Sequence, residues 1–139
     1  MKREDLPEGT VTFQFMPDQP EIDEFLIRQV IKGEKTATCM PAAHVEQGLE
    51  QEPVVGRQDV ALDHKGQPVF KIETVSLFRC AFKDVPEEFA LAEGEGPYEQ
   101  WERNHRELFE KWGIYSPEME VICERFKLIE VFDRAENTG

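Results

Sequence analysis

The stretch Gly-Glu-Lys-Thr-Ala-Thr (residues 33–38) decides the fold, because a helical pattern ends there and an extended one begins. Before it, apolar residues at positions 22, 25, 26 and 30 recur at helical spacing, and Gly33 is a natural stop just past the last turn. Residues 36–40 are β-branched and apolar, which predicts a short strand. In that strand Thr36 and Thr38 share one face, and Lys35 stands at its entrance.

Outward from this stretch, further alternating or apolar runs predict strands: residues 11–15, 60–63, 69–74, 76–82 and 119–132. Gly66 lies between the second and third runs and supplies the positive φ of a hairpin turn. Residues 98–112 carry a stripe of large side chains at spacings of three and four, which predicts a helix. The order of elements shows no regular βαβ alternation, so we expect an α+β domain with a curved or closed sheet and helices at its ends.

One domain is expected over residues 11–132, because the chain of 139 residues contains no internal linker. Residues 1–10 are charged and contain Pro and Gly, so we expect a flexible lead-in. Residues 133–139 are expected to form a C-terminal tail.

The formal charge of −13 disfavours a polyanionic partner, because affinity for nucleic acids comes mainly from cations that neutralise phosphates. Residues 84–110 hold nine acidic and two basic side chains, so more than half of the excess lies there. A small, nearly neutral ligand meets no such barrier. Tight RNA binding would require the basic residues to gather on one face.

Three cysteines at wide spacing, with no CxxC pair, indicate reduced thiols in a cytoplasmic protein. No metal site and no cofactor are expected. The first residues lack an apolar segment, and no run approaches membrane-spanning length, so we expect neither secretion nor a membrane partner. Nothing indicates an obligate protein partner.

Two polar stretches can carry chemistry. A threonine hydroxyl becomes a nucleophile only when a base takes its proton, and Lys35 could do this for Thr38 if burial lowered its pKa. The Glu-Gly-Glu-Gly run (residues 93–96) holds two carboxylates on a flexible backbone, and a carboxyl against an apolar wall can keep its proton and act as an acid. The simpler alternatives are a surface lysine and an exposed acidic loop.

The aromatic stripe contains Tyr98, Trp101 and Trp112, which either pack in the core or stack on a base. Core packing is expected for most of them. His105, in the same stripe, is expected to be a partly buried, hydrogen-bonded histidine.

Several motifs occur together in one order: Gly-x-Lys-Thr-Ala-Thr (33–38), Gly-x-Pro (66–68), Phe-x-Asp-Val (82–85), Phe-Ala-x-x-Glu-Gly-Glu-Gly (89–96), and Trp and His four residues apart (101 and 105). This succession resembles the ASCH domain of the PUA-like superfamily over roughly residues 11–131, both its longer members and the N4-acetylcytidine amidohydrolases. The resemblance implies a PUA-like mixed β-barrel with flanking helices and a groove for a nucleoside-like ligand or single-stranded RNA.

In the amidohydrolases, the motif residues that match Lys35, Thr38 and Glu93 are the proton acceptor, the nucleophile and the proton donor. Around them we expect ligand contacts from six residues: Thr36, Glu95, Tyr98, Trp101, His105 and Arg57. The longer family commonly has Asp after the Glu-Gly-Glu-Gly run and a basic residue after the Trp, whereas this chain has Pro97 and Glu102.

Pro97 and Glu102 weaken the case for an RNA-binding or ribonuclease function more than the case for hydrolysis of an acylated cytosine nucleoside. Both functions stay open at this point, as does a domain that binds a nucleotide-like metabolite without chemistry. An RNA groove would need five basic residues to converge: Arg28, Lys32, Lys35, Arg57 and Arg79.

Overall fold

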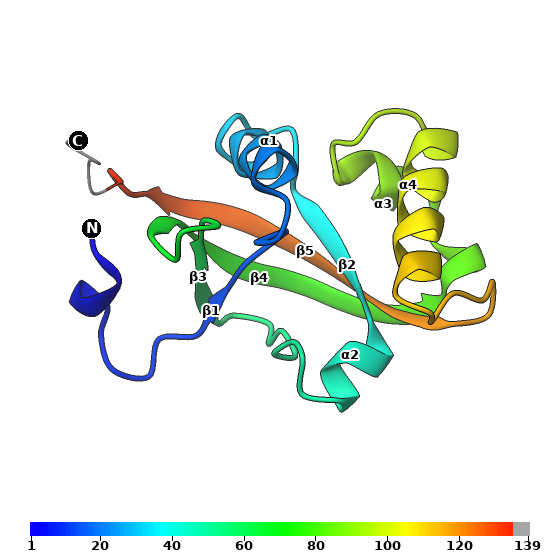
Figure 1. Cartoon of the computed structure of the whole chain (residues 1–139), viewed down its shortest axis with the longest axis horizontal. Coiled ribbons are helices and arrows are strands. Elements are labelled where there is room, and N and C mark those ends of the chain that lie inside the picture. The colour runs from blue at the N-terminus through cyan, green and yellow to red at the C-terminus, as the bar shows by residue number, and fades with distance from the viewer. Residues whose placement is uncertain (135–139) are drawn as a thin grey trace.

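Five strands form one sheet in the order β1-β3-β4-β5-β2 in the computed structural model, which describes residues 1–134 (Figure 1). The strands are β1 (Thr12–Phe13), β2 (Ala37–Pro41), β3 (Gln58–Leu62), β4 (Pro68–Ala81) and β5 (Glu120–Val131). The β1–β3 pair is parallel and the other three pairs are antiparallel. Within the described residues β1 and β2 are the two edges, so the α+β class is confirmed but the sheet is open, not a closed barrel.

Strand β4 is longer than the sequence pattern predicts. Residues 69–74 and 76–82 belong almost entirely to one strand of 14 residues, whose pairing with β5 shifts register between Thr74 and Ser76. Val75 between them is exposed, which explains why the alternation breaks there. The hairpin before β4 turns at Gly66 with φ +83°, as expected. The first strand is shorter than predicted and spans only Thr12–Phe13.

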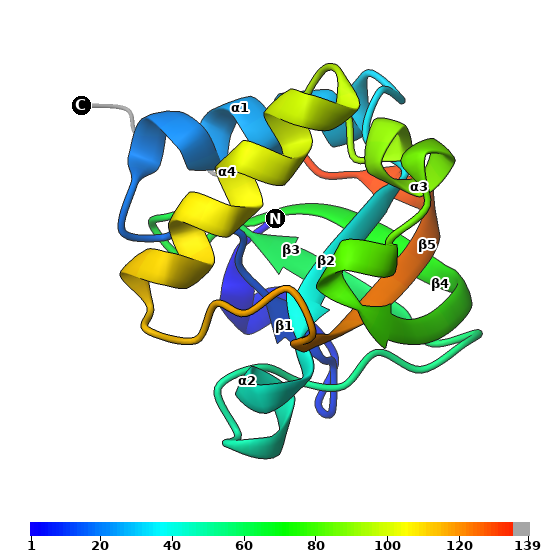
Figure 2. The same ribbon diagram turned by 90° about the vertical axis from the view of Figure 1, so that its right-hand side faces the viewer.

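The helices are η1 (Arg3–Asp5), α1 (Pro20–Ile31), α2 (Ala42–Glu46), η2 (Phe82–Asp84), α3 (Glu87–Ala92) and α4 (Tyr98–Lys111), of which η1 and η2 are 3-10 helices. Helix α1 runs along one side of the sheet, whereas α3 and α4 lie together at one end of the molecule (Figures 1 and 2). None of the helices in residues 1–134 is long and apolar enough to cross a membrane.

Two main apolar cores hold the helices on the sheet. Trp101 and Phe109 of α4 pack with Phe89 of α3 and with the β2 and β5 strands. Ile27 and Val30 of α1 pack over a second cluster on β3, β4 and β5. Burial of such side chains contributes about 1.5–3 kcal/mol each. The segment 32–36 connects α1 to β2, and therefore runs from one core to the other.

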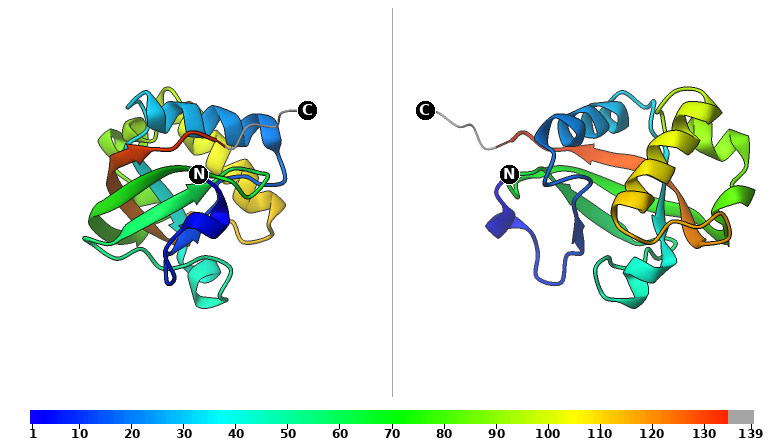
Figure 3. Two further views of the ribbon diagram at one scale, coloured as in Figure 1. Left: turned by 90° about the vertical axis from the view of Figure 1, so that its left-hand side faces the viewer. Right: turned by 45° about the vertical axis from the view of Figure 1, so that its right-hand side comes forward.

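The start of the chain contacts the end of β5. The amino group of Met1 donates to the carbonyl oxygen of Asp133 at 2.8 Å, and Leu6 packs against Val60, Leu62 and Phe132. Figure 3 shows the start of the chain and the end of β5 on the same side of the molecule. Of the predicted C-terminal tail, residues 135–139 lie outside the described residues.

Candidate functional site

The turn after α1 places Lys35 in the interior of the molecule. Helix α1 ends at Ile31, and Gly33 leaves it with φ +82°. The backbone amides of Glu34 and Lys35 then both donate to the carbonyl oxygen of Gln29, at 2.9 and 3.0 Å. These two bonds satisfy one carbonyl acceptor near the helix end and fix the turn that carries the lysine.

Lys35 is 3% exposed, so its ammonium group depends on protein partners. Nζ donates to the carbonyl oxygen of Ala37 at 2.9 Å. It also lies 3.4 Å from both the carbonyl oxygen and Oε1 of Glu93. Three acceptors match the three protons of an ammonium group. The lysine is therefore built into the structure as a cation paired with Glu93.

The loop that carries Glu93 docks directly on the lysine turn. The amide of Thr36 donates to the carbonyl oxygen of Ala92 at 2.8 Å, and Nε2 of Gln29 donates to that of Gly94 at 2.9 Å. Gly94 has φ +77°, and a Cβ there would lie 2.7 Å from the carbonyl oxygen of Glu34. Close approach of the two loops therefore requires glycine at this position.

Glu93 is 1% exposed and sits between three donors. Its Oε1 faces Lys35 and lies 3.5 Å from Nε2 of His105, while Nε1 of Trp101 donates to its Oε2 at 2.8 Å. Burial alone would raise the pKa of Glu93, but Lys35 and then His105 lower it to about 2. The carboxyl is thus ionised at neutral pH, opposite to the state expected for a carboxyl against an apolar wall.

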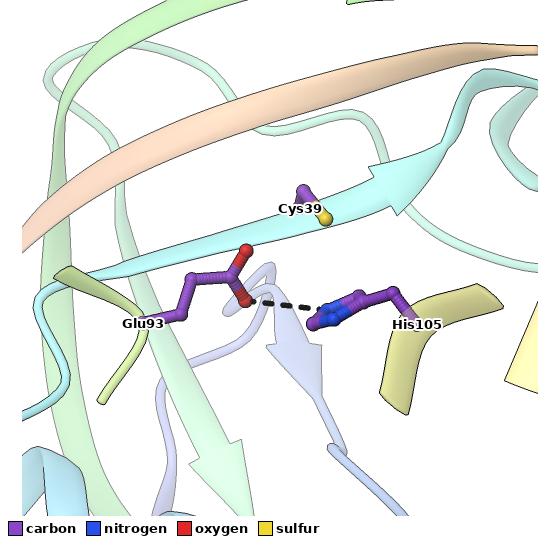
Figure 4. Close-up of side chains that lie close together, drawn as sticks. All are labelled: Cys39, Glu93 and His105. Atoms are coloured by element: carbon purple, nitrogen blue, oxygen red, sulfur yellow. Dashed lines mark ion pairs between the residues drawn. The ribbon is translucent and has the colours of Figure 1, made fainter. Parts of the chain in front are cut away.

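His105 and Cys39 complete this cluster (Figure 4). Nδ1 of His105 lies 2.9 Å from the carbonyl oxygen of Trp101, which points Nε2 at Glu93. Burial disfavours the charged ring, but Glu93 outweighs it and raises the pKa of His105. Burial, followed by the charge of Glu93, raises the pKa of the Cys39 thiol well above its ordinary value. The thiol is therefore neutral and unsuited to nucleophilic attack.

Thr38 lines a groove of about 1400 Å³ together with Lys35, Glu93, Glu95 and His105. The structure therefore brings five of the nine residues expected at the site to one cavity. Thr38 is half-buried on β2 and lines the groove.

Four expected ligand contacts lie elsewhere: Thr36, Tyr98, Trp101 and Arg57 are not on the groove wall. Thr36 is exposed. Trp101 is fully buried and stacks on Phe82 with ring centroids 5.4 Å apart, so neither face is open to a base. Tyr98 stacks on Trp101. As placed, Trp101 supports Glu93 instead of facing a ligand.

The expected RNA groove is not formed by these residues. Of the five basic side chains it requires, only Lys35 lines the cavity described above. Arg57 is bound by both carboxylate oxygens of Asp59, at 2.6 and 2.9 Å, and Arg79 pairs with Glu52 and Glu120. The groove wall carries seven Asp and Glu side chains against three Lys and Arg, which disfavours a polyphosphate chain.

Glu124 was not among the site residues expected from the sequence. It is 5% exposed on β5 and lines the same groove. It lies directly opposite Thr38 in the β2–β5 pairing. A signal was available, because Glu124 lies between Ile122 and Phe126 in the same alternation phase of β5, where an apolar side chain would be expected.

Two groups of side chains bring together donor types that bind metal ions: Cys39, Glu93 and His105, and Asp23, Glu24 and His64. In the first group both oxygens of Glu93 already accept from protein donors. In the second, Nδ1 of His64 lies 3.8 Å from Oδ2 of Asp23, and neither atom has a hydrogen-bond partner. The residues of this second group come from helix α1 and from the β3–β4 hairpin, which are far apart in the sequence. No metal-ligand motif in the sequence therefore indicates this group.

This fold and buried site define an α+β domain of the PUA-like type. The sequence matches the ASCH domain family over residues 12–130, and the chain belongs to that family. No functionally curated protein matches it.

Solved structures agree with this assignment. An ASCH domain from Lactobacillus crispatus JV V101 is 28% identical with a TM-score of 0.76, covering 87% of this chain and 80% of its own. A protein from Enterococcus faecalis V583 is also 28% identical with a TM-score of 0.76, covering 91% and 80%. A mutant ASCH protein from Zymomonas mobilis is 7% identical with a TM-score of 0.58, covering 92% and 74%, and shows the fold alone.

Proposed function

We propose that the chain hydrolyses the acyl amide of an N4-acylated cytosine nucleoside bound in the groove. The observation that carries the proposal is the buried Lys35–Glu93 pair on the wall of the cavity that also exposes Thr38. A buried ion pair contributes little to net stability, so a functional reason for it is favoured. The resemblance to the amidohydrolases assigns the same three positions.

The resting ion pair holds the proton on the wrong partner for catalysis. Transfer of one proton from Nζ of Lys35 to Oε1 of Glu93, across 3.4 Å, makes the base and the acid together. Neutral Lys35 takes the proton of Thr38 while Oγ1 attacks the acyl carbon. The C–N bond breaks, Glu93 gives its proton to the departing N4 nitrogen, and the ion pair is restored.

The second half-reaction releases the acyl group. Water attacks the acyl ester on Thr38 and gives a proton to the Glu93 carboxylate. Lys35 returns a proton to the Thr38 oxygen as the ester bond breaks, which leaves the neutral pair and a free acid. Each half-reaction thus balances within the same two groups.

RNA binding, which the family's fold suggests, remains the alternative function. We favour a nucleoside because the groove wall is acidic and the cations that RNA would need lie outside it or pair with carboxylates. An affinity for single-stranded RNA that falls steeply with added salt would support the alternative.

The test is deacetylation of N4-acetylcytidine, followed by chromatography. Wild type should release cytidine, and Thr38→Ala or Lys35→Ala should slow release by about 10²-fold or more. Thr36→Ala is the matched control, because that hydroxyl is exposed and off the groove, and it should retain activity. Absence of turnover by wild type, or full turnover by folded Lys35→Ala, would count against the proposal.

A further inference from the structure

A second glutamate, Glu124, lines the groove from strand β5, which pairs with the strand that carries Thr38. Glu124 and Thr38 are directly opposed in the antiparallel β2–β5 pair. Side chains so placed have Cβ atoms about 4.5–5.5 Å apart. A ligand whose reacting carbon is beside Thr38 therefore has its neighbouring atoms within reach of Glu124.

The surroundings of Glu124 differ from those of Glu93. The hydroxyl of Thr74 on β4 bonds its Oε2 at 2.6 Å. Among the described residues Oε1 has no hydrogen-bond partner, and it is not one of the fully buried unpartnered atoms, so it stays reachable from the groove that Glu124 lines. An oxygen that faces the groove and has no protein partner is free to form a hydrogen bond with a ligand.

Within residues 1–134 no charged side chain forms a direct ion pair with Glu124. Asp59 on β3 is a negatively charged neighbour, and Asp59 itself engages Arg57 through both oxygens. Burial raises the pKa of Glu124; the Thr74 hydrogen bond opposes this, Asp59 adds to it, and Arg57 and Lys35 act against it with less effect. The neutral acid is therefore favoured more than for an ordinary glutamate.

With Oε2 accepting from Thr74, the proton of the neutral acid resides on Oε1 and points into the groove. We propose that Glu124 orients the ligand, its Oε1–H donating a hydrogen bond to an acceptor atom of an uncharged heterocycle such as the unprotonated ring nitrogen or carbonyl oxygen of cytosine. This rests on the proposed function for the nature of the ligand, but it concerns binding and not the hydrolytic step.

Cytidine is the probe, because it contains the heterocycle and has no acyl group to lose. Isothermal titration calorimetry between pH 5.5 and 9 should show wild-type affinity falling as pH rises, since ionised Glu124 loses its donor. Glu124→Gln keeps an N–H donor and should bind with little dependence on pH. Glu124→Leu should bind about 10- to 100-fold more weakly at low pH. Glu130→Gln, an exposed change on the same strand, should match wild type.

Because His105 also titrates, the difference between wild type and Glu124→Gln isolates Glu124. Equal pH profiles in those two proteins, or undiminished affinity in folded Glu124→Leu, would overturn the inference while leaving hydrolysis intact. If N4-acetylcytidine is cleaved but cytidine does not bind, the inference also fails alone. Neither binding nor turnover would overturn both proposals.

Discussion

Replacing Glu93 by Gln tests whether the buried ion pair exists as described. The amide keeps an acceptor for Trp101 but leaves the Lys35 ammonium without its counter-charge. Removing one partner of a buried pair typically costs about 3–5 kcal/mol. The free energy of unfolding at pH 7, from urea titration followed by tryptophan fluorescence, should fall by that amount. Glu99→Gln, an exposed change on α4, should have a small effect.

The dependence on pH provides the sharper result. A folded-state pKa of about 2 against an ordinary value of 4.5 corresponds to about 3 kcal/mol at 1.36 kcal/mol per pKa unit. Because the folded pKa is lowered, this stabilisation is present above pH 4.5 and is lost as pH falls toward 2. The stability difference between wild type and Glu93→Gln should therefore shrink by about 3 kcal/mol from pH 6 to pH 2. A difference that stays constant over that range would show that the ionised Glu93 carboxylate does not stabilise the fold.

Three further predictions concern the support around this pair. Gly94→Ala should destabilise the protein by about 1–3 kcal/mol, because its Cβ would meet a backbone oxygen 2.7 Å away. Gly96→Ala is the control, because Gly96 also has positive φ but open space around it, and this change should cost less. Urea unfolding of both variants measures the two losses in stability, and equal losses would contradict the prediction. Trp101→Phe should cost about 1–3 kcal/mol in the same assay by removing the donor to Glu93, and an unchanged stability would argue against that bond. The pKa of His105, measured by NMR titration, should exceed 6.5 in wild type and fall in Glu93→Gln, because burial then dominates. The stability that this group contributes is present below pH 6.5 and is lost as pH rises through the raised pKa. An unchanged pKa in the variant would contradict the contact between His105 and Glu93.

The sequence pattern predicted the elements that position the site, because their signals are local. Gly33 ends α1 and residues 36–40 begin the next strand, so the placement of Lys35 and Thr38 follows from neighbours in sequence. The joining of two apolar runs into β4 was missed, because the register shift at Val75 disrupts the alternation.

Contacts between distant segments were harder to predict. The aromatic stripe of α4 is one helical face, but the sequence does not say that this face packs on η2 and β5, which takes Trp101 away from any ligand. The ionised state of Glu93 depends on a lysine 58 positions earlier, so an argument from the acidic loop alone expected the opposite protonation. Glu124 carried a signal in its phase with apolar neighbours, but its role depends on the groove that α1, β2 and α4 enclose.

A crystal soaked with cytidine or N4-acetylcytidine would show where the nucleoside binds. We expect ordered density for the base in the groove, with its polar edge against Glu124 and the N4 substituent beside Thr38. Density bound at another surface, or a nucleoside in the groove whose N4 group points away from Lys35 and Thr38, would contradict this expectation.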